Sequence, residues 1–394
     1  MTRPDPVGLL IVGSGPAGVS AAEAFRQLDP ESTIVILSAD PQLPYARPPL
    51  SKEYLTGESD DISLHPQQWY DERAIERRHG LTVDRIDVEN RYVRAGDQNF
   101  QYRTLVLATG AAPVPLPVPG GEHALQLRSA SDAAMLRSAA AQAETAVVIG
   151  AGFIGCEAAA SLAAQGVSVS LVAPESAPQV NRLGSIAGER LRDLVEQAGV
   201  RFRGGVEVTA IAYSTATTSV RLDDGSSIDA DLVLAATGVT PQSGFAEAAG
   251  LEVRESRIVV GSNMQTSSPG IYAAGDVALA YNETAGRHLA VEHWQDADDQ
   301  GAIAGTCAAG VTAAWSAVPG FWSSIGEATV KYHAWGDGHQ DSRLVEHGED
   351  SFTVWYTGSQ GSVAVGVLTY NADDDYDTGG TLIRQRSPIP VHVQ

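Results

Sequence analysis

Cysteine is almost absent from this chain of 394 residues, which contains only Cys156 and Cys307. Neither belongs to a C-x-x-C or C-x4-C pair, so we expect no redox-active disulfide, and we expect Cys156 to be a buried packing residue. No apolar run approaches the roughly 20 residues that a membrane-spanning helix requires. The first expected strand begins soon after Met1, which leaves no room for a signal peptide, and we expect a cytoplasmic protein without membrane insertion.

Positive charge is also scarce, and the formal net charge is -22. This balance disfavours nucleic acid as a partner, and it opposes an acidic protein partner unless arginines gather locally on one surface. Among the 26 basic residues, lysine occurs only at Lys52 and Lys331. Both positions are therefore candidates for a specific role, although compositional bias alone would also explain the pattern.

Two glycine-rich turns stand out against this background. Each follows an apolar strand and opens an alanine-rich helix, and the two turns span 13–18 and 150–155. Glycine allows the tight turn and lets the backbone approach a pyrophosphate, which the N–H groups of the helix N-terminus then bind. Two such turns predict two dinucleotides on one protein, and the simplest reason to hold both is to pass electrons between them.

The two halves of the chain show the same order of elements. The first half predicts a strand over 7–13, a helix over 16–28 and a strand over 33–38, and the second half repeats this order from residue 145. Residues 318–394 alternate short apolar runs with Gly and Asp turns, which is typical of a small β domain. We predict an α/β protein with two Rossmann-like dinucleotide-binding domains and a small, mostly β C-terminal domain. The expected boundaries are 1–113 with 240–317, then 114–239, then 318–394.

Two shorter segments carry local predictions. Residues 63–76 have a helical pattern. The acidic run over 373–377 lacks the spacing and the glutamate of an EF-hand, so we expect a solvated loop and no metal site.

Four motifs resemble one branch of the flavoprotein reductases that bind FAD and NAD(P)H. This branch contains the oxygenase-coupled ferredoxin reductases, of the putidaredoxin and rubredoxin type, and apoptosis-inducing factor. The motifs are Arg47-Pro-Pro-Leu-Ser-Lys52, Gly150-Ala-Gly-Phe-Ile-Gly-Cys-Glu157, Gly275-Asp276 followed by Val291-Glu-His-Trp294, and Phe321-Trp-Ser323. One departure is the continuation Ser324-Ile325, where the ferredoxin reductases usually have Asp-Gln, and this stretch is closer to apoptosis-inducing factor.

The resemblance implies that FAD is bound by 1–113 with 240–317, NAD by 114–239, and that 318–394 is an interface domain. The residues implied at FAD are Gly13, Gly15, Pro16, Ala17, Gly18, Arg47, Lys52, Thr109, Gly110, Arg128, Gly275, Asp276, Glu292, His293, Trp294 and Trp322. Asp40 follows the second strand and could accept hydrogen bonds from the adenosine ribose, although a turn role beside Pro41 is an alternative. Arg128 could equally be a surface arginine.

The residues expected at the nicotinamide dinucleotide are Gly150, Gly152, Phe153, Ile154, Gly155 and Glu175. Glu175 lies 25 residues after Gly150, near the spacing at which an acid meets the ribose 2′-hydroxyl. A carboxylate there repels a 2′-phosphate, so we predict NADH over NADPH. Arg182 lies near enough in sequence to keep NADPH as an alternative.

Four residues are candidates for the reaction itself: Lys52, Glu157, Phe153 and His293. By resemblance, Lys52 approaches flavin N5 and is held by Glu157, so that a fixed ammonium stabilises the negative charge that hydride transfer adds. Phe153 could stack over the flavin and swing aside for nicotinamide, or it could simply pack at a domain junction. His293 could hydrogen-bond the flavin or be a structural histidine.

The predicted function is an FAD-dependent NADH oxidoreductase that passes electrons to a ferredoxin-type iron–sulfur protein serving an oxygenase. One alternative is a redox sensor like apoptosis-inducing factor, in which a long-lived reduced complex changes shape or association. Another alternative is an NADH oxidase or small-molecule oxidoreductase. We expect a monomer or a homodimer.

Overall fold

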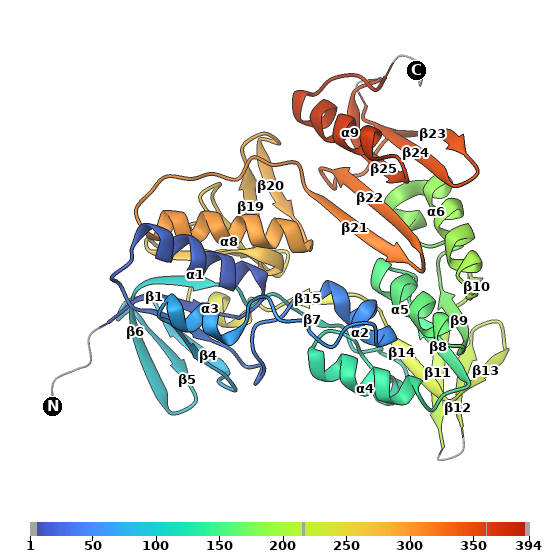
Figure 1. Ribbon diagram of the computed structural model, residues 1–394, viewed down its shortest axis with the longest axis horizontal. Helices are drawn as coiled ribbons and strands as arrows, with labels where there is room; N and C mark the ends of the chain where they lie inside the picture. The colour runs from blue at the N-terminus through green and yellow to red at the C-terminus, as the bar shows by residue number, and fades with distance from the viewer. Residues whose placement is uncertain (1–5, 215–216, 360, 391–394) are drawn as a thin grey trace. The chain divides into compact units, whose positions relative to one another are not determined.

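The computed structural model describes residues 6–214, 217–359 and 361–390 (Figure 1). Residues 1–5 and 391–394, at the ends of the first and last predicted domains, lie outside this description. Contacts divide the chain into two units. Unit 1 comprises Met1–Ala46, Ser63–Ala112 and Thr240–Pro319, and unit 2 comprises Arg47–Ile62, Pro113–Val239 and Gly320–Gln394. The division into three domains stays a prediction.

Unit 1 is built on a sheet whose central strands are parallel. Their order is β3 (Ile75–Arg78), β2 (Ile34–Leu37), β1 (Val7–Val12) and β6 (Gln98–Leu107), and β18 (Ile271–Ala273) pairs with β6 as well. The strands β5 (Tyr92–Ala95) and β4 (Val83–Asp87) extend the sheet antiparallel beyond the first part of β6. The middle strands are buried over nearly their whole length, as expected for strands covered on both faces.

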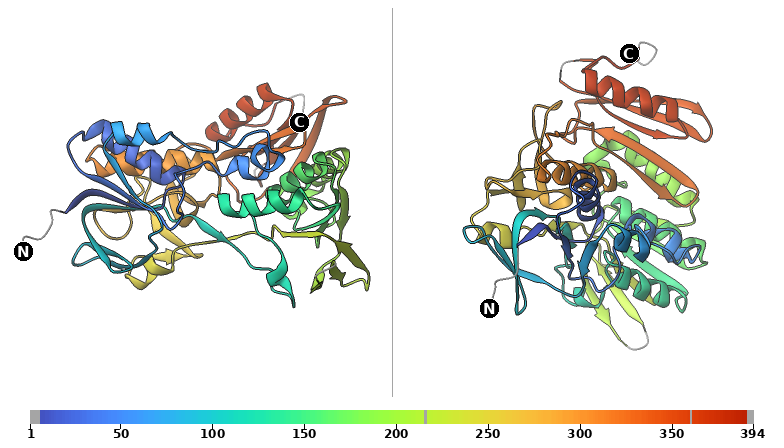
Figure 2. Two further views of the ribbon diagram at one scale, coloured as in Figure 1. Left: turned by 60° about the horizontal axis from the view of Figure 1, so that its bottom comes forward. Right: turned by 60° about the vertical axis from the view of Figure 1, so that its left-hand side comes forward.

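Helices α1 (Pro16–Leu28) and α8 (Trp294–Ala308) pack side by side in unit 1 (Figures 1 and 2). Two glycines of α8 make this approach possible: a Cβ added at Gly301 would lie 2.2 Å from Ala17 O, and one at Gly305 would lie 2.2 Å from Ala21 O. The contact brings the first two turns of α1 against α8, although the two segments are almost 280 residues apart in the chain.

The remaining elements of unit 1 are short. They are α3 (Gln67–Glu72), α7 (Gly244–Ala248), the 3-10 helix η3 (Gly275–Val277), and a sheet of β16 (Val253–Arg254), β17 (Arg257–Val260), β19 (Ala278–Asn282) and β20 (Arg287–Ala290). The helix predicted over 63–76 is wrong at both ends, because α3 begins only at Gln67 and Ile75–Arg78 forms β3, which pairs with β2.

Unit 2 contains a second parallel sheet in the order β10 (Arg201–Gly204), β9 (Ser168–Ala173), β8 (Thr145–Ile149) and β14 (Leu232–Ala235). Its helices are α4 (Ala130–Ala140), α5 (Phe153–Ala164) and α6 (Val180–Gln197), and a three-stranded meander follows in β11 (Val208–Tyr213), β12 (Thr218–Leu222) and β13 (Ser227–Ala230). The 3-10 helix η1 (Pro48–Ser51) and helix α2 (Glu53–Thr56) also belong to this unit.

The last part of unit 2 is an antiparallel sheet. Its order is β21 (Gly320–Ile325), β22 (Ala328–Ala334), β25 (Ala364–Tyr370), β24 (Ser351–Thr357) and β23 (Asp341–Gly348), and α9 (Asp373–Gln385) packs on it. The solvated loop predicted over 373–377 is wrong, because this acidic run forms the first turn of α9. Negative side chains favour the N-terminus of a helix through its dipole.

The predicted fold class is confirmed: two glycine-turn sheets lie in an α/β framework with a mostly β C-terminal part. Across the described residues, no helix combines the length and the apolar character needed to cross a membrane.

Candidate dinucleotide and hydride-transfer site

The first glycine turn lies between β1 and α1, and it leaves no room for a Cβ at its first and last glycines. Gly13 has φ +110°, and a Cβ on it would lie 2.1 Å from Ala108 O, while one on Gly18 would lie 2.1 Å from Gly13 O. The first hydrogen bond of α1 runs from Val19 N–H to Gly15 O, so the N–H groups of Ala17 and Gly18 precede the helical ladder. Gly15 offers no side-chain cap and Pro16 opens the helix. This backbone cradle fits a pyrophosphate.

The second glycine turn, between β8 and α5, repeats this construction. Gly150 has φ +104° with Ala236 O 2.4 Å from an added Cβ, and a Cβ on Gly155 would lie 1.9 Å from Gly150 O. The helix again starts without a side-chain cap, at Gly152, and Ile154 in its first turn is 47% exposed. The two cradles are thus equivalent in backbone geometry, one in each unit.

Matching threonines follow the strand beside each turn. Thr109 Oγ1 donates to Gln242 O at 2.9 Å, and Thr237 Oγ1 donates to Val114 O at 3.0 Å. These residues flank two short strands, β7 (Ala111–Pro113) and β15 (Val239–Pro241), which pair with each other. Gly110 has φ +63°. The predicted Thr109-Gly110 turn is therefore held by hydrogen bonds to Gln242.

Gly275 and Asp276 form η3, close to the first cradle. Gly275 has φ +78°, and a Cβ there would lie 3.3 Å from the Cβ of Ala17 and 3.4 Å from that of Ala297. Gln300, only 1% exposed, accepts a hydrogen bond from Gly275 N–H through Oε1 at 3.0 Å. Helices α1 and α8 and the Gly-Asp turn thus meet at one place in unit 1.

His293 is the residue that precedes α8, and Trp294 is the first residue of that helix. His293 Nδ1 lies 3.1 Å from Asp296 Oδ2, and the Asp296 side chain is almost fully buried. Glu292 forms an ion pair with Arg257. The carboxylate of Glu292 is therefore engaged within unit 1.

The carboxylate of Asp40 is used within its own loop. Oδ1 accepts from Gln42 N–H at 3.0 Å, and Oδ2 accepts from Tyr45 O–H at 2.6 Å. These bonds correspond to the turn role that the sequence left open, and contact with a ribose stays a prediction.

Four residues predicted at FAD belong to unit 2, namely Lys52, which is described below, and three others. Arg47 precedes η1, and Arg128 precedes Ser129, the residue that caps α4 through a capping box with Asp132. Trp322 lies in β21 and is 44% exposed. These three residues belong to unit 2, whereas the Gly13–Gly18 turn belongs to unit 1, so their contact with FAD stays a prediction.

Glu175 follows β9 in a loop that faces the start of α6. Its Oε1 accepts from Asn181 Nδ2 at 3.4 Å, and its backbone carbonyl accepts from Gly205 N–H at 3.0 Å. The guanidinium of Arg182 lies 5.7 Å from the ring centre of Phe321 and 6.0 Å from that of Tyr332. Arg182 thus interacts with aromatic faces in the C-terminal sheet.

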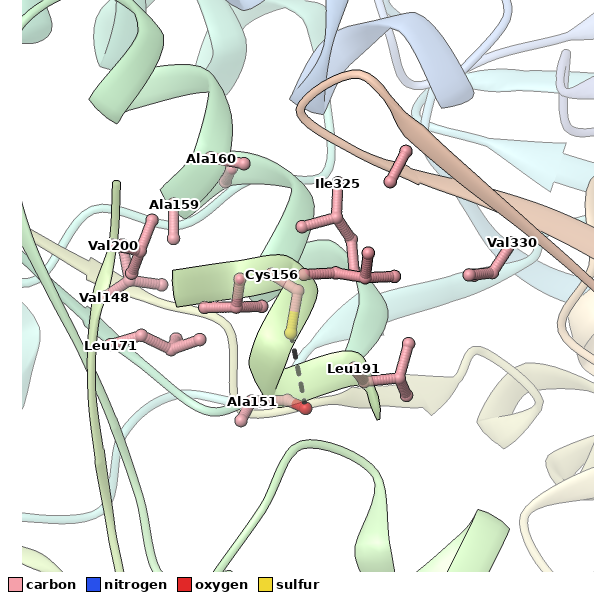
Figure 3. Close-up of a cluster of buried hydrophobic side chains, with 14 of the residues drawn as sticks. Val148, Ala151, Cys156, Ala159, Ala160, Leu171, Leu191, Val200, Ile325 and Val330 are labelled. Atoms are coloured by element: carbon pink, nitrogen blue, oxygen red, sulfur yellow. Dashed lines mark hydrogen bonds between the residues drawn. The ribbon is translucent and has the colours of Figure 1, made fainter. Parts of the chain in front are cut away.

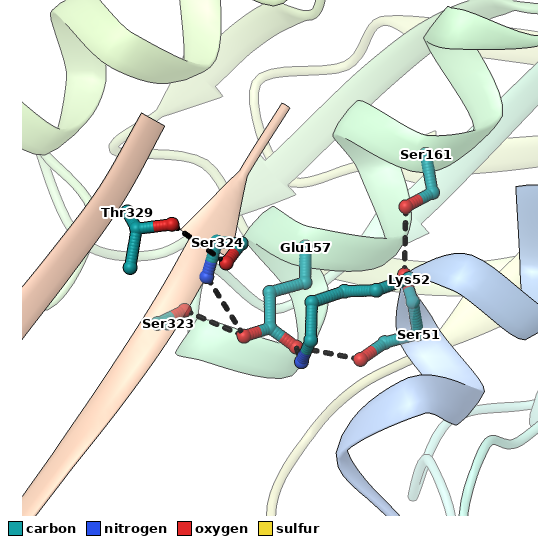
Figure 4. A network of polar contacts seen from close by, with 7 residues as sticks. All are labelled: Ser51, Lys52, Glu157, Ser161, Ser323, Ser324 and Thr329. Carbon is teal, nitrogen blue, oxygen red and sulfur yellow. Dashed lines mark hydrogen bonds and ion pairs between the residues drawn. The ribbon is translucent and has the colours of Figure 1, made fainter. Parts of the chain in front are cut away.

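Glu157 is the centre of a buried polar network (Figure 4). The residue is 3% exposed, and its carboxylate accepts four hydrogen bonds. Oε2 accepts from Ser51 Oγ at 2.5 Å and from Lys52 Nζ at 2.9 Å. Oε1 accepts from Ser323 Oγ at 2.7 Å and from Ser324 N–H at 3.3 Å. These bonds use the four lone-pair sites of a carboxylate, so they offset the cost of burying it.

The lysine side of the network is held just as closely. Ser161 Oγ donates to Ser51 O at 2.7 Å, which ties α5 to the end of η1 (Figure 4). Lys52 has φ -127° and ψ -111° at the junction of η1 and α2, and its side chain is 12% exposed. A partly exposed ammonium is therefore fixed beside a buried carboxylate, immediately after the second cradle. This arrangement can stabilise a negative charge that develops next to Nζ.

Phe153 begins α5 and is half-buried. Its ring centre lies 4.7 Å from that of Phe321, with an edge-to-face angle of 68°. Within unit 2 the ring therefore has an aromatic partner at the start of β21.

Cys156 lies on α5 with its side chain in the buried core, and its Sγ is 3.8 Å from Ala151 O (Figure 3). Burial raises the pKa of this thiol to about 12, so it is protonated near neutral pH and a poor nucleophile. Cys307 lies in unit 1, and both cysteines are free thiols. The site therefore has no dithiol available for electron transfer.

Sequence reasoning missed four residues that the structure adds: Ser51, Ser323, Gln300 and Asp296. Ser51 and Ser323 stand inside motifs that were recognised, but their bonds to Glu157 span 106 and 166 residues. The sequence feature that could have identified these two serines was that each lies next to a candidate site residue in its motif. Gln300 and Asp296 follow His293 at helical spacing, which could have placed them on one face of α8.

Comparison with known proteins agrees with this geometry. A reductase component from Burkholderia cepacia, described as the anthranilate 1,2-dioxygenase system ferredoxin–NAD(+) reductase component, is 31% identical over 95% of this chain and 93% of its own. Apoptosis-inducing factor 3 of Mus musculus is 33% identical over 92% of this chain and 61% of its own.

Among solved structures, the covalent putidaredoxin reductase–putidaredoxin complex has a TM-score of 0.92 at 30% identity, covering 99% of this chain and 95% of that chain. The family model described as pyridine nucleotide-disulphide oxidoreductase matches residues 8–301. Proteins of this family and the NAD-dependent ferredoxin reductases within it use a flavin together with NAD(H). The chain belongs to the pyridine nucleotide-disulphide oxidoreductase family, in the group that includes ferredoxin–NAD reductases and apoptosis-inducing factor 3.

Proposed function

We propose that the protein is an FAD-dependent NADH reductase that delivers electrons to a ferredoxin-type iron–sulfur protein. The observation that supports this most strongly is the pair of equivalent glycine cradles, one per unit, with the Lys52–Glu157 pair directly after the second. The relatives named as ferredoxin reductases point to the acceptor.

When bound, FAD supplies an acceptor for the hydride of NADH and a donor of single electrons. The residues of the chain bind the two dinucleotides and orient them. The Gly13–Gly18 cradle binds the FAD pyrophosphate with backbone N–H groups, and the Gly150–Gly155 cradle does the same for NADH. Lys52 places an ammonium where negative charge accumulates, and Glu157 fixes the position of that ammonium.

A stopped-flow experiment tests the acceptor. The FAD-loaded protein is mixed with NADH and an oxidised [2Fe–2S] ferredoxin, and bleaching of the ferredoxin is followed. Turnover of about 1 per second or faster is expected, within the usual range of enzymes. Flavin reduction without any reduction of ferredoxin would contradict the proposed acceptor.

A second candidate function has its own support. Apoptosis-inducing factor 3 is as similar in sequence as the ferredoxin reductases, and the Ser324-Ile325 continuation departs from the reductase pattern. In a redox sensor, the reduced protein would persist with a long-wavelength absorbance band and would change its association state. The same stopped-flow traces, followed by size-exclusion chromatography of the NADH-treated protein, distinguish this function from fast turnover.

The preference for NADH gives a direct prediction. We expect kcat/KM with NADH to exceed that with NADPH at least about tenfold, because Glu175 repels a 2′-phosphate while Arg182 lies against Phe321 and Tyr332. Steady-state rates with both donors check this. Glu175→Gln should narrow the ratio, whereas Glu207→Gln, at an exposed position in the same unit, should leave it unchanged. A clear preference for NADPH in the unmodified protein would refute the role of Glu175.

A further inference from the structure

Strand β21 runs alongside helix α5, and two of its side chains contact two side chains of the helix. Ser323 Oγ donates to Glu157 at 2.7 Å, and the ring centre of Phe321 lies 4.7 Å from that of Phe153. Both helix residues were singled out for the hydride-transfer site. The strand belongs to the C-terminal sheet and the helix to the NAD-binding part of the same unit.

The spacing of these contacts is matched in the two elements. Phe153 and Glu157 are four residues apart, so they share one face of α5 and are separated by about 6 Å along its axis. Phe321 and Ser323 are two residues apart, so they share one face of β21 and are separated by about 6.6 Å. Because β21 and α5 run in the same direction with matching spacing, Phe321 lies opposite Phe153 and Ser323 lies opposite Glu157.

The alternation along β21 supports the same arrangement. Ser323 and Ile325 are each 1% exposed, whereas Trp322 between the contacts is 44% exposed. Ile325 lies in the buried cluster that contains Cys156 of α5 (Figure 3). The inward face of β21 is thus packed against α5 from Phe321 to Ile325.

Strand β21 is itself held on its other edge. It pairs with β22 in the register Phe321↔Tyr332 and Ser324↔Thr329, and the rings of Phe321 and Tyr332 lie 5.4 Å apart. The guanidinium of Arg182 covers both rings. The strand therefore has little freedom to move away from the helix.

We propose that β21 positions residues of α5 that take part in the transfer of hydride from NADH. In this proposal Ser323 is the positioning residue for Glu157, and Phe321 is the positioning residue for Phe153. This inference rests on the proposed NADH-dependent reduction of the flavin, and it does not depend on which acceptor follows. It gives the C-terminal sheet a role in hydride transfer, beyond that of an interface domain.

The test uses the reductive half-reaction of the FAD-loaded protein with NADH, followed by stopped flow. Ser323→Ala removes one of the two donors to Oε1 of Glu157, and the limiting rate of flavin reduction should fall about tenfold, as for a lost hydrogen bond to a charged group. In a Glu157→Gln background the same change should lower the rate less than about twofold, because Ser323 acts through the carboxylate.

Thr329→Ala is the matched control. It removes a side-chain hydrogen bond to Ser324 on the other face of the same strand, 3.0 Å in length. It should change the reduction rate less than about twofold, although its melting temperature should drop about as much as that of Ser323→Ala. Equal rates in Ser323→Ala and Thr329→Ala would overturn the role of Ser323.

A binding measurement tests Phe321 separately. The dissociation constant of NAD+ is determined by calorimetry for Phe153→Leu, Phe321→Leu and the double variant. The edge-to-face pair predicts coupling of roughly 2- to 10-fold, so the double variant should resemble a single one. Additive changes would overturn the role of Phe321.

Fast flavin reduction without reduction of ferredoxin would contradict the proposed acceptor alone and leave this inference standing.

Discussion

Replacing Lys52 by methionine is expected to slow reduction of the flavin by NADH roughly 100-fold, the usual loss when one preorganised donor is removed from a developing charge. Methionine has a similar length and no charge, so it keeps the volume while removing the ammonium that lies 2.9 Å from Glu157. The carboxylate keeps its bonds from Ser51 and Ser323, so the fold should survive. Stopped-flow absorbance of the flavin measures the rate.

The other lysine of the chain supplies the control. Lys331 pairs with Asp373 at 2.7 Å, with a side chain that is about one-third exposed, and it has no contact with Glu157 among the interactions described. Lys331→Met changes the net charge equally and should leave the rate of flavin reduction within about twofold. If Lys52→Met is reduced as fast as the unmodified protein, the ammonium has no part in hydride transfer.

Alanine at the third glycine of each turn should separate the two dinucleotide sites. A Cβ at Gly18 would lie 2.1 Å from Gly13 O, and one at Gly155 would lie 1.9 Å from Gly150 O. Backbone must move in both cases, at a cost of roughly 1–3 kcal/mol, equivalent to roughly 5- to 150-fold weaker binding. Gly18→Ala should therefore lose FAD on gel filtration. Gly155→Ala should keep its yellow colour but bind NAD+ more weakly by calorimetry.

Gly244→Ala is the matched control for this pair. Gly244 opens α7, and an added Cβ there meets no atom within 4 Å. This variant should retain FAD and bind NAD+ like the unmodified protein. Reversed losses, with NAD+ binding weakened by Gly18→Ala and FAD lost from Gly155→Ala, would mean that the two cradles have been assigned to the wrong dinucleotides.

The parts of the fold with strong local signals could be predicted from sequence. The helix expected over 16–28 has these bounds in the structure, because Pro16 and the preceding glycine turn fix its start. The first two residues of β3, Ile75 and Glu76, were mistaken for the end of a helix. Pairing of this strand with β2 at the sheet edge decides the outcome against the local helical pattern. The acidic start of α9 was likewise mistaken for a loop.

The candidate site likewise contains some residues that could be predicted from sequence and others that could not. Lys52 and Glu157 were paired through the resemblance, and the structure places them 2.9 Å apart. Ser323 could not be predicted, because its bond to Glu157 spans 166 residues and depends on how β21 packs on α5. Gln300 was missed for a related reason, since its bond to Gly275 requires the packing of α8 against α1. Contacts between distant segments are a property of the packed fold, and a single sequence carries little trace of them.

An anaerobic titration of the purified, FAD-reconstituted protein with NADH, followed by visible absorbance, tests most directly whether NADH reduces a flavin bound to this chain. We expect a yellow protein that bleaches in proportion to the NADH added, with one equivalent sufficient for full reduction. A protein that binds no FAD, or whose absorbance is unchanged by NADH and NADPH, would contradict the proposed FAD-dependent oxidation of NADH.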